Sequence, residues 1–181
     1  MELRILGAHN IESSGAGFAS YLIDGILAVD AGNISSGLSF YEQGKIKAII
    51  LTHPHYDHLR DIPAIGMSFR MMKKTLDVYA PEPVREALLA HFINGSLYPD
   101  FTKKSEKTPE TPPVMTLHPV EPGKKFTVLG YEILPIPVVH AVPAIGYQIT
   151  SPGGKKVFIT SDTGPGLAET WKQVSPHLLF I

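Results

Sequence analysis

Cysteine is absent from the 181 residues of this sequence. Disulfides, zinc fingers, iron–sulfur clusters and thiol catalysis are therefore excluded, and any metal ion must be held by nitrogen and oxygen ligands. The chain also lacks an apolar run near the ~20 residues that a membrane helix needs. Its first residues, which include Glu2 and Arg4, do not resemble a signal peptide. These absences predict a cytoplasmic protein without a membrane span.

Basic and acidic side chains are also nearly equal in number, so neither charge is in excess. The 16 basic and 17 acidic side chains give a formal net charge of −1. The sequence therefore predicts no broad basic surface that could hold nucleic acid by neutralising phosphates, although a local basic patch stays open. The length favours a single domain over residues 1–181.

The first half of the chain alternates strand and helix patterns. Residues 21–29 hold two apolar runs around an Asp24-Gly25 turn, which predicts a β-hairpin. Residues 46–51 are almost continuously apolar, as expected of a strand buried on both faces. Apolar residues at helical spacing then occupy residues 62–72 and 83–92, each with a proline near the predicted helix start.

The second half repeats strands followed by a helix. Residues 126–134 and 145–160 each predict two strands around a glycine-containing turn, and residues 165–174 have helical spacing. The polar, proline-rich residues 102–113 between the halves are expected to form an exposed loop rather than a domain boundary. Two such halves predict two sheets packed face to face with helices outside.

An apolar strand begins at Leu178, and the chain stops inside it at Ile181. This position predicts one of two situations. Either the natural domain continues past Ile181, or a partner, such as a second copy in a homodimer, completes the sheet.

The segment His53-x-His55-x-Asp57-His58 carries the strongest chemical signal. It follows the buried strand directly, in the position where α/β proteins commonly bind ligands. Alternate residues of an extended segment point to the same side, so His53 and His55 can hold one ion. Asp57 and His58, at the following turn, can face a second ion. The alternative is a loop of surface histidines.

Two metal sites need more ligands than this segment supplies. His140 follows the apolar run 136–139, and it is either a further ligand or a structural histidine. Asp162 follows the apolar run 157–160 and could bridge two ions, or it could cap the helix that follows.

Two other polar residues near these positions each have two alternative roles. Asp30 follows a third strand and could hold a ligand histidine through the second nitrogen of the ring, or serve a turn. Tyr56, inside the histidine segment, could touch substrate or be an ordinary exposed loop tyrosine. His118 and His177 are expected to be structural or exposed.

The sequence THPHYDHLRD at residues 52–61, together with Asp30-Ala-Gly, His140 and the later Ser-Asp-Thr-Gly, resembles the metallo-β-lactamase superfamily. The resemblance spans nearly the whole chain. It implies an α/β (α+β) fold, a four-layer αββα sandwich of two mixed β-sheets flanked by helices. It also implies a dinuclear metal site with two divalent ions, zinc first, with iron or manganese as alternatives.

The resemblance also assigns ligands. His53, His55 and His140 would bind the first metal, and Asp57 and His58 the second, with Asp162 bridging the two. The superfamily usually supplies one more histidine well after the bridging aspartate. The only histidine after Asp162 is His177, which comes too early, and this fits a domain that continues beyond the sequence given.

Residues 158–181 look most similar to class II cyclic-nucleotide phosphodiesterases and to relatives near ribonuclease Z. The expected activity is hydrolysis of phosphodiester bonds in a small-molecule or nucleotide substrate by a metal-bound hydroxide, with Asp57 also managing the proton of the water. Two alternatives remain: an ester, thioester or lactone hydrolase, and a metal-binding remnant without activity. The sequence identifies no substrate-binding residues.

Overall fold

A computed structural model describes residues 1–104 and 110–181 of the protein. The chain folds as two compact units. The N-terminal unit is Glu2–Pro119, and the C-terminal unit is Val120–Ile181 together with Met1. The centre of the loop predicted at residues 102–113 lies outside the described residues. The prediction of a single domain over residues 1–181 stays a prediction.

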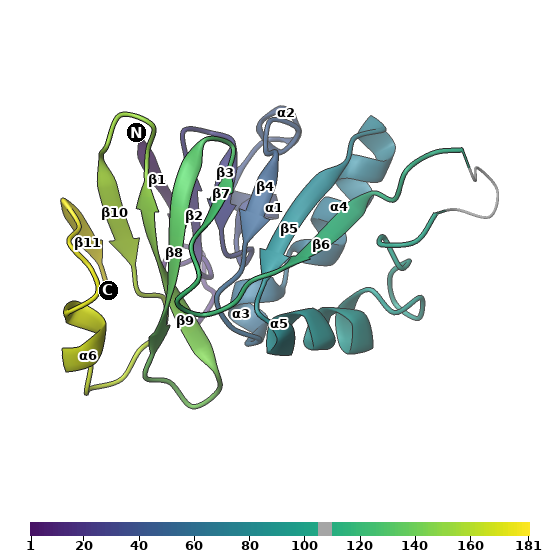
Figure 1. Ribbon diagram of the computed structural model, residues 1–181. Helices are drawn as coiled ribbons and strands as arrows, with labels where there is room; N and C mark the ends of the chain where they lie inside the picture. The colour runs from purple at the N-terminus through teal and green to yellow at the C-terminus, as the bar shows by residue number, and fades with distance from the viewer. Residues whose placement is uncertain (105–109) are drawn as a thin grey trace. The chain divides into compact units, whose positions relative to one another are not determined.

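The N-terminal unit contains a six-stranded mixed sheet in the order β1-β2-β3-β4-β5-β6 (Figure 1). Its first three strands are antiparallel neighbours, and β3 to β6 run parallel to one another. The strands are β1 Leu3–Gly7, β2 Ser20–Ile23, β3 Leu27–Val29, β4 Ala48–Ile50, β5 Leu76–Ala80 and β6 Met115–Pro119.

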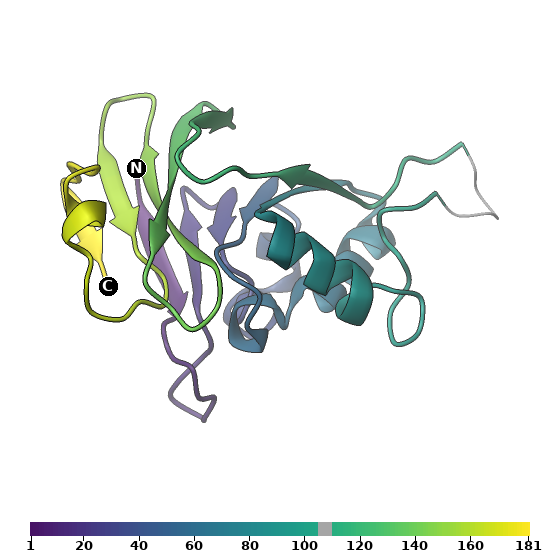
Figure 2. The ribbon, with the colours of Figure 1, turned by 60° about the horizontal axis from the view of Figure 1, so that its bottom comes forward.

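The predicted hairpin joins β2 to β3 through Asp24 and Gly25, which both have positive φ angles, 47° and 72°. Two such residues in succession match the right-handed twist of the flanking strands. Figure 2 shows the loop between β1 and β2 extending beyond the ends of these strands. This loop brings Phe18 close to the start of β2.

Helices connect the parallel strands of the N-terminal unit, as parallel pairing requires. Between β3 and β4 lie α1 and α2, between β4 and β5 lie α3 and α4, and between β5 and β6 lies α5, continued by a single π-helical turn, η1. Their bounds are α1 Ile34–Gly37, α2 Phe40–Gln43, α3 Tyr56–Leu59, α4 Ile62–Met72, α5 Glu82–Ala87 and η1 Leu88–Phe92.

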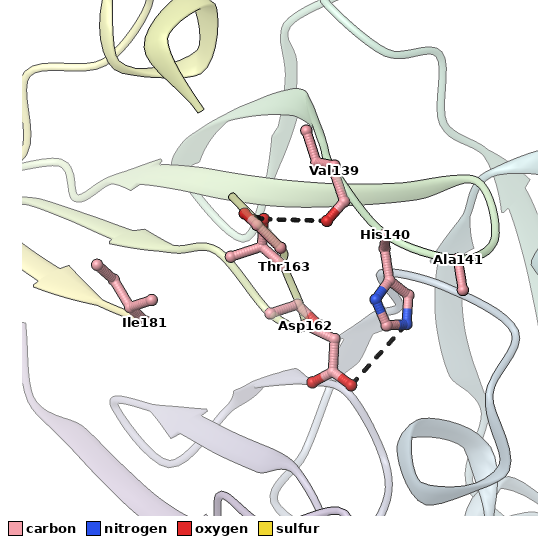
Figure 3. Close-up of a pocket in the computed structure, with 8 residues that line it drawn as sticks. Val139, His140, Ala141, Asp162, Thr163 and Ile181 are labelled. Carbon is pink, nitrogen blue, oxygen red and sulfur yellow. Dashed lines mark hydrogen bonds and ion pairs between the residues drawn. The ribbon is translucent and has the colours of Figure 1, made fainter. Parts of the chain in front are cut away.

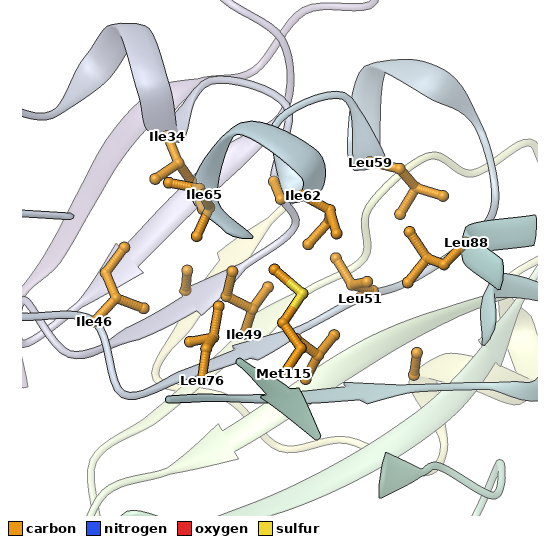
Figure 4. Packing of buried hydrophobic residues seen from close by; sticks show 14 of the residues in the cluster. Ile34, Ile46, Ile49, Leu51, Leu59, Ile62, Ile65, Leu76, Leu88 and Met115 are labelled. Atoms are coloured by element: carbon orange, nitrogen blue, oxygen red, sulfur yellow. The ribbon is translucent and has the colours of Figure 1, made fainter. Parts of the chain in front are cut away.

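One hydrophobic core holds these helices against the sheet. Ile62 and Ile65 of α4 face Ile49 and Leu76 of the strands, and all four side chains are fully buried or nearly so (Figure 4). The spacing of three between Ile62 and Ile65 places both on one helix face. Pro63 occupies the first turn of α4, where a missing amide proton costs nothing. The predicted helix over residues 62–72 is confirmed.

The C-terminal unit contains a five-stranded mixed sheet in the order β11-β10-β9-β8-β7. Strands β7 to β10 are antiparallel neighbours, whereas β10 and β11 are parallel. The strands are β7 Phe126–Val128, β8 Tyr131–Val138, β9 Ala144–Thr150, β10 Lys156–Ile159 and β11 Leu178–Phe180. Since β8 and β10 both pair antiparallel with β9, they point the same way, and their carboxyl ends lie at the same edge of this sheet.

The helix predicted at residues 165–174 is wrong in its length, because α6 spans only Ala168–Trp171. Gly166 precedes it with a φ of 101°, which belongs to no right-handed helix, and Pro176 follows soon after. The short helix still packs on the sheet: the Trp171 ring meets Phe158 edge-on at a centroid distance of 6.1 Å. Among the described residues, no helix has the length and apolar character of a membrane span.

Candidate metal centre

The histidine segment begins where β4 ends, in the N-terminal unit. His53 is fully buried, and the chain stays extended to His55, which precedes the first turn of α3. The Nε2 atom of His53 lies 3.1 Å from the Nδ1 atom of His55. Two nitrogen ligands at ~2.0–2.1 Å from one tetrahedral zinc ion would be roughly 3.3 Å apart. The two rings therefore present nitrogen atoms at the separation that a shared ion requires.

Asp57 and His58 belong to the first turn of α3. The Nε2 atom of His58 lies 3.5 Å from Oδ2 of Asp57, and only 1% of the His58 residue is exposed. The rings of His53 and His58 have centroids 4.0 Å apart. The turn into α3 thus gathers three imidazoles and one carboxylate into a compact cluster of borderline and hard donors, which suits a divalent metal ion.

Asp30 contacts this cluster through His58 and is completely buried. It follows β3, and its φ of 58° turns the chain so that the carboxylate points toward the end of β4. His58 Nδ1 lies 2.8 Å from Asp30 Oδ2. An ionised carboxylate only accepts hydrogen bonds, so Nδ1 of His58 must carry the proton. The lone pair of His58 is then on Nε2, which is the atom beside Asp57.

Thr52 extends the influence of Asp30 to His53. The Thr52 hydroxyl donates to the Asp30 carboxylate, with distances of 3.0 and 2.9 Å to its two oxygens, and lies 3.1 Å from Nδ1 of His53. Because the single hydroxyl proton is directed at the carboxylate, the hydroxyl oxygen accepts from His53 Nδ1. One buried carboxylate therefore fixes the tautomers of two histidines, and each is left with a lone pair on Nε2.

Gly32 allows the Asp30 loop to pack directly on the backbone of α3. A Cβ atom at this position would lie 1.8 Å from the carbonyl oxygen of Asp57 and 2.8 Å from that of Ala19. Nearby, the amide of Ala31 donates to the carbonyl of His58 at 2.7 Å. The segment after β3 thus positions the first turn of α3.

We expect Gly32→Ala to displace Asp57 and weaken metal binding, since the new methyl group meets backbone atoms that cannot rotate away. Disturbing the groups around metal ligands typically costs about 10- to 100-fold in metal affinity. Competition with a metal-sensitive dye would measure this change. The matched control is Gly15→Ala, where a Cβ atom would meet nothing within 4 Å. Equal metal affinity in both variants would contradict the packing argument.

The C-terminal unit brings together the other two predicted residues. His140 follows β8, Asp162 follows β10, and the Nε2 atom of His140 lies 3.9 Å from Oδ2 of Asp162. Both line a pocket with Val139, Ala141 and other residues of this unit, and Figure 3 shows the imidazole and the carboxylate facing one another. The separation is too long for a direct hydrogen bond, and it is compatible with two ligands of one ion.

The structure excludes the alternative role of Asp162 and identifies the partners of two other histidines. Asp162 does not cap the following helix, because α6 begins at Ala168 after the N-cap residue Leu167. His118 and His177 have structural partners, as expected: His118 Nε2 lies 2.7 Å from Asp77 Oδ1, and His177 Nδ1 accepts from the Lys156 amide at 3.1 Å. Thr52, which links Asp30 to His53 by hydrogen bonds, was not predicted as a site residue.

Comparison with known protein families finds a match to the model described as the beta-lactamase superfamily domain, over residues 27–181. Among curated proteins, ribonuclease Z of Methanocaldococcus jannaschii is 29% identical over 119 residues. That alignment covers 64% of this chain and 35% of the relative. The chain therefore spans about a third of the length of the curated relatives that it matches.

Solved structures show the same fold. The metallo-β-lactamase fold protein YhfI from Bacillus subtilis has a TM-score of 0.78 at 21% identity, with 98% of this chain and 68% of that chain covered. Unliganded yeast PDE1 has a TM-score of 0.71 at 15% identity, with 91% and 65% covered. At these identities the likeness concerns the fold, and it confirms the predicted α+β class with two mixed sheets.

Proposed function

Because the chain belongs to the beta-lactamase superfamily domain family, we propose that it hydrolyses phosphodiester bonds with the help of divalent metal ions. The observation that carries the proposal is the cluster of His53, His55, Asp57 and His58, in which buried hydrogen bonds aim unprotonated ring nitrogens at neighbouring ligand atoms. Relatives named ribonuclease Z and a structural neighbour named PDE1 support the phosphodiester as the bond that is cleaved.

We propose that the residues predicted as metal ligands are the ligands. His53, His55 and His140 would hold a first ion, Asp57 and His58 a second, and Asp162 would bridge them. The donor set of imidazoles and carboxylates, without thiolates, suits zinc and also accepts iron or manganese. When bound, a pair of such ions lowers the pKa of a water molecule and offsets the charge that develops on phosphoryl oxygens.

The protein's own groups would perform the remaining tasks. Asp57 is only partly buried, so its carboxylate can accept the proton of the attacking water as well as bind metal. Asp30 and Thr52 would act as positioning residues, since their hydrogen bonds to Nδ1 orient the rings of His58 and His53.

The test is turnover by metal-loaded, full-length protein. We expect hydrolysis of bis-p-nitrophenyl phosphate and of cyclic AMP, loss of this activity after chelation, and recovery when zinc, iron or manganese is restored. A parallel panel of carboxylic esters, thioesters and lactones should be turned over poorly. Preference for that panel would replace the phosphodiester with a carbonyl substrate, and bound metal without any turnover would support a binding protein instead.

A further inference from the structure

Three aromatic side chains form a contiguous row beside the histidine segment: Phe18, Tyr56 and Phe92. The rings of Phe18 and Tyr56 meet edge-on, with centroids 6.1 Å apart. The rings of Tyr56 and Phe92 are inclined by only 27°, with centroids 6.2 Å apart. We call these three side chains the aromatic row, and all of them belong to the N-terminal unit.

Tyr56 is the central ring of the row, and 59% of this residue is exposed. A ring that stays largely in solvent contributes little to the hydrophobic core, and here it adjoins two half-buried aromatic rings, Phe18 and Phe92. Exposed apolar surface beside such a cluster can mark a binding site. Its backbone is nonetheless fixed, because Tyr56 opens α3 and its carbonyl accepts from the Arg60 amide at 2.8 Å. The ring therefore extends from a fixed backbone position between His55 and Asp57, which are proposed metal ligands.

The other two rings support Tyr56. Arg60 covers one face of Phe18, with its guanidinium carbon 4.9 Å from the ring centroid. Phe92 ends the π-helical turn η1, a type of turn that is frequent at functional sites. An aromatic residue at each flank limits the motion of the tyrosine ring, so less freedom is lost when a ligand binds to it.

The charge of Arg60, which contacts the aromatic row, is engaged within the protein. Arg60, the cation in contact with the row, is bound to the carboxylates of Glu12 and Asp61. The positive charge of the guanidinium is therefore already balanced by these two ion pairs. With a formal net charge of −1 the chain has no excess of cationic side chains, and discrimination between a nucleotide and another phosphate ester requires a contact with the base.

We propose that the aromatic row is a stacking site for a nucleobase, with Tyr56 as the ring on which the base lies. This inference rests on the proposed function, because it places the base of a substrate next to the centre that binds its phosphodiester. Stacking on aromatic rings accepts every base, so the substrate class is a phosphodiester that carries an unpaired nucleobase. A cyclic mononucleotide and the end of a single-stranded RNA both satisfy this chemistry.

The experiment compares the binding of AMP and ribose 5-phosphate to the metal-loaded full-length chain by calorimetry, which requires no turnover. The two ligands differ in the base alone. We expect AMP to bind about 5- to 150-fold more tightly, which is the range that one stacked base contributes. Tyr56→Ala should lower AMP affinity to the level of ribose 5-phosphate and leave the latter unchanged, whereas Tyr56→Phe should keep the preference. Tyr41→Ala is the matched control, because Tyr41 is 74% exposed on α2, outside the row.

A trinucleotide of adenosine separates the two sources of the base. Tighter binding than AMP, with part of the gain lost in Phe92→Ala, indicates an RNA end that uses two rings, and equal binding indicates a mononucleotide. Retention of the AMP preference in Tyr56→Ala, or its absence from the unaltered protein, overturns the proposal even if phosphodiesters are hydrolysed. If phosphodiesters are not hydrolysed but the preference depends on Tyr56, the stacking site stands and the proposed function falls.

Discussion

Replacing His53 with alanine should lower metal content and reduce phosphodiester turnover by about 10³-fold, because the contribution of a catalytic metal is worth several kcal/mol. His53 is fully buried, and its Nε2 atom lies 3.1 Å from the Nδ1 atom of His55. Loss of this nitrogen leaves His55 without the second nitrogen of the pair. Metal analysis by atomic emission and steady-state kinetics with bis-p-nitrophenyl phosphate measure the two effects.

The control for this variant is His91→Ala, since His91 is an exposed histidine in η1. It should retain both metal content and activity. Circular dichroism must show that His53→Ala keeps its secondary structure, so that loss of metal is not loss of fold. If folded His53→Ala keeps the metal content and turnover of the unaltered protein, His53 is not a ligand.

The part of the site that is local in sequence was predictable from residue types and spacing. His53 and His55 were expected to share a side because alternate residues of an extended chain do so, and their facing nitrogens agree with this. Strand β4 was predicted from an almost continuously apolar run, as a strand buried on both faces, and such strands end where ligands commonly bind.

The role of Thr52 was not predictable in the same way. It depends on Asp30, which is 22 positions earlier in the chain. The two residues meet because β3 and β4 pair in parallel with Val29 opposite Ile50, so that the ends of both strands fall at one edge. A threonine at the end of an apolar run does not indicate which strand pairs with that run. The register between strands must be known before the hydrogen-bond chain from Asp30 through Thr52 to His53 can be recognised.

The short α6 and the π-helical turn η1 were missed for a different reason. Apolar spacing over residues 165–174 resembles a helix, but Gly166 adopts a left-handed φ and shortens it. In η1, the Ile93 amide donates to the carbonyl of Leu88, five residues earlier. Periodicity in the sequence does not distinguish this pattern from an ordinary α-helical turn. The consequence for function is the placement of Phe92 beside Tyr56.

The second large effect concerns Asp162. We expect Asp162→Ala to lose about 10³-fold in turnover, the same order as His53→Ala, because a bridging carboxylate serves both proposed ions. Asp162 also faces His140 at 3.9 Å, so its removal alters the surroundings of another proposed ligand. Asp162→Asn retains the size of the side chain and removes its charge, and it should be nearly as inactive.

The double variant His53→Ala/Asp162→Ala decides whether the two residues act in one centre. Groups that act as a unit are strongly non-additive, so a joint centre predicts that the double variant is about as inactive as either single variant. Independent roles would instead multiply the two losses to about 10⁶-fold, because the free energies of separate sites add. Turnover of all three variants, measured at saturating metal, therefore tests the shared dinuclear centre directly, since multiplied losses are incompatible with ligands that serve the same pair of ions.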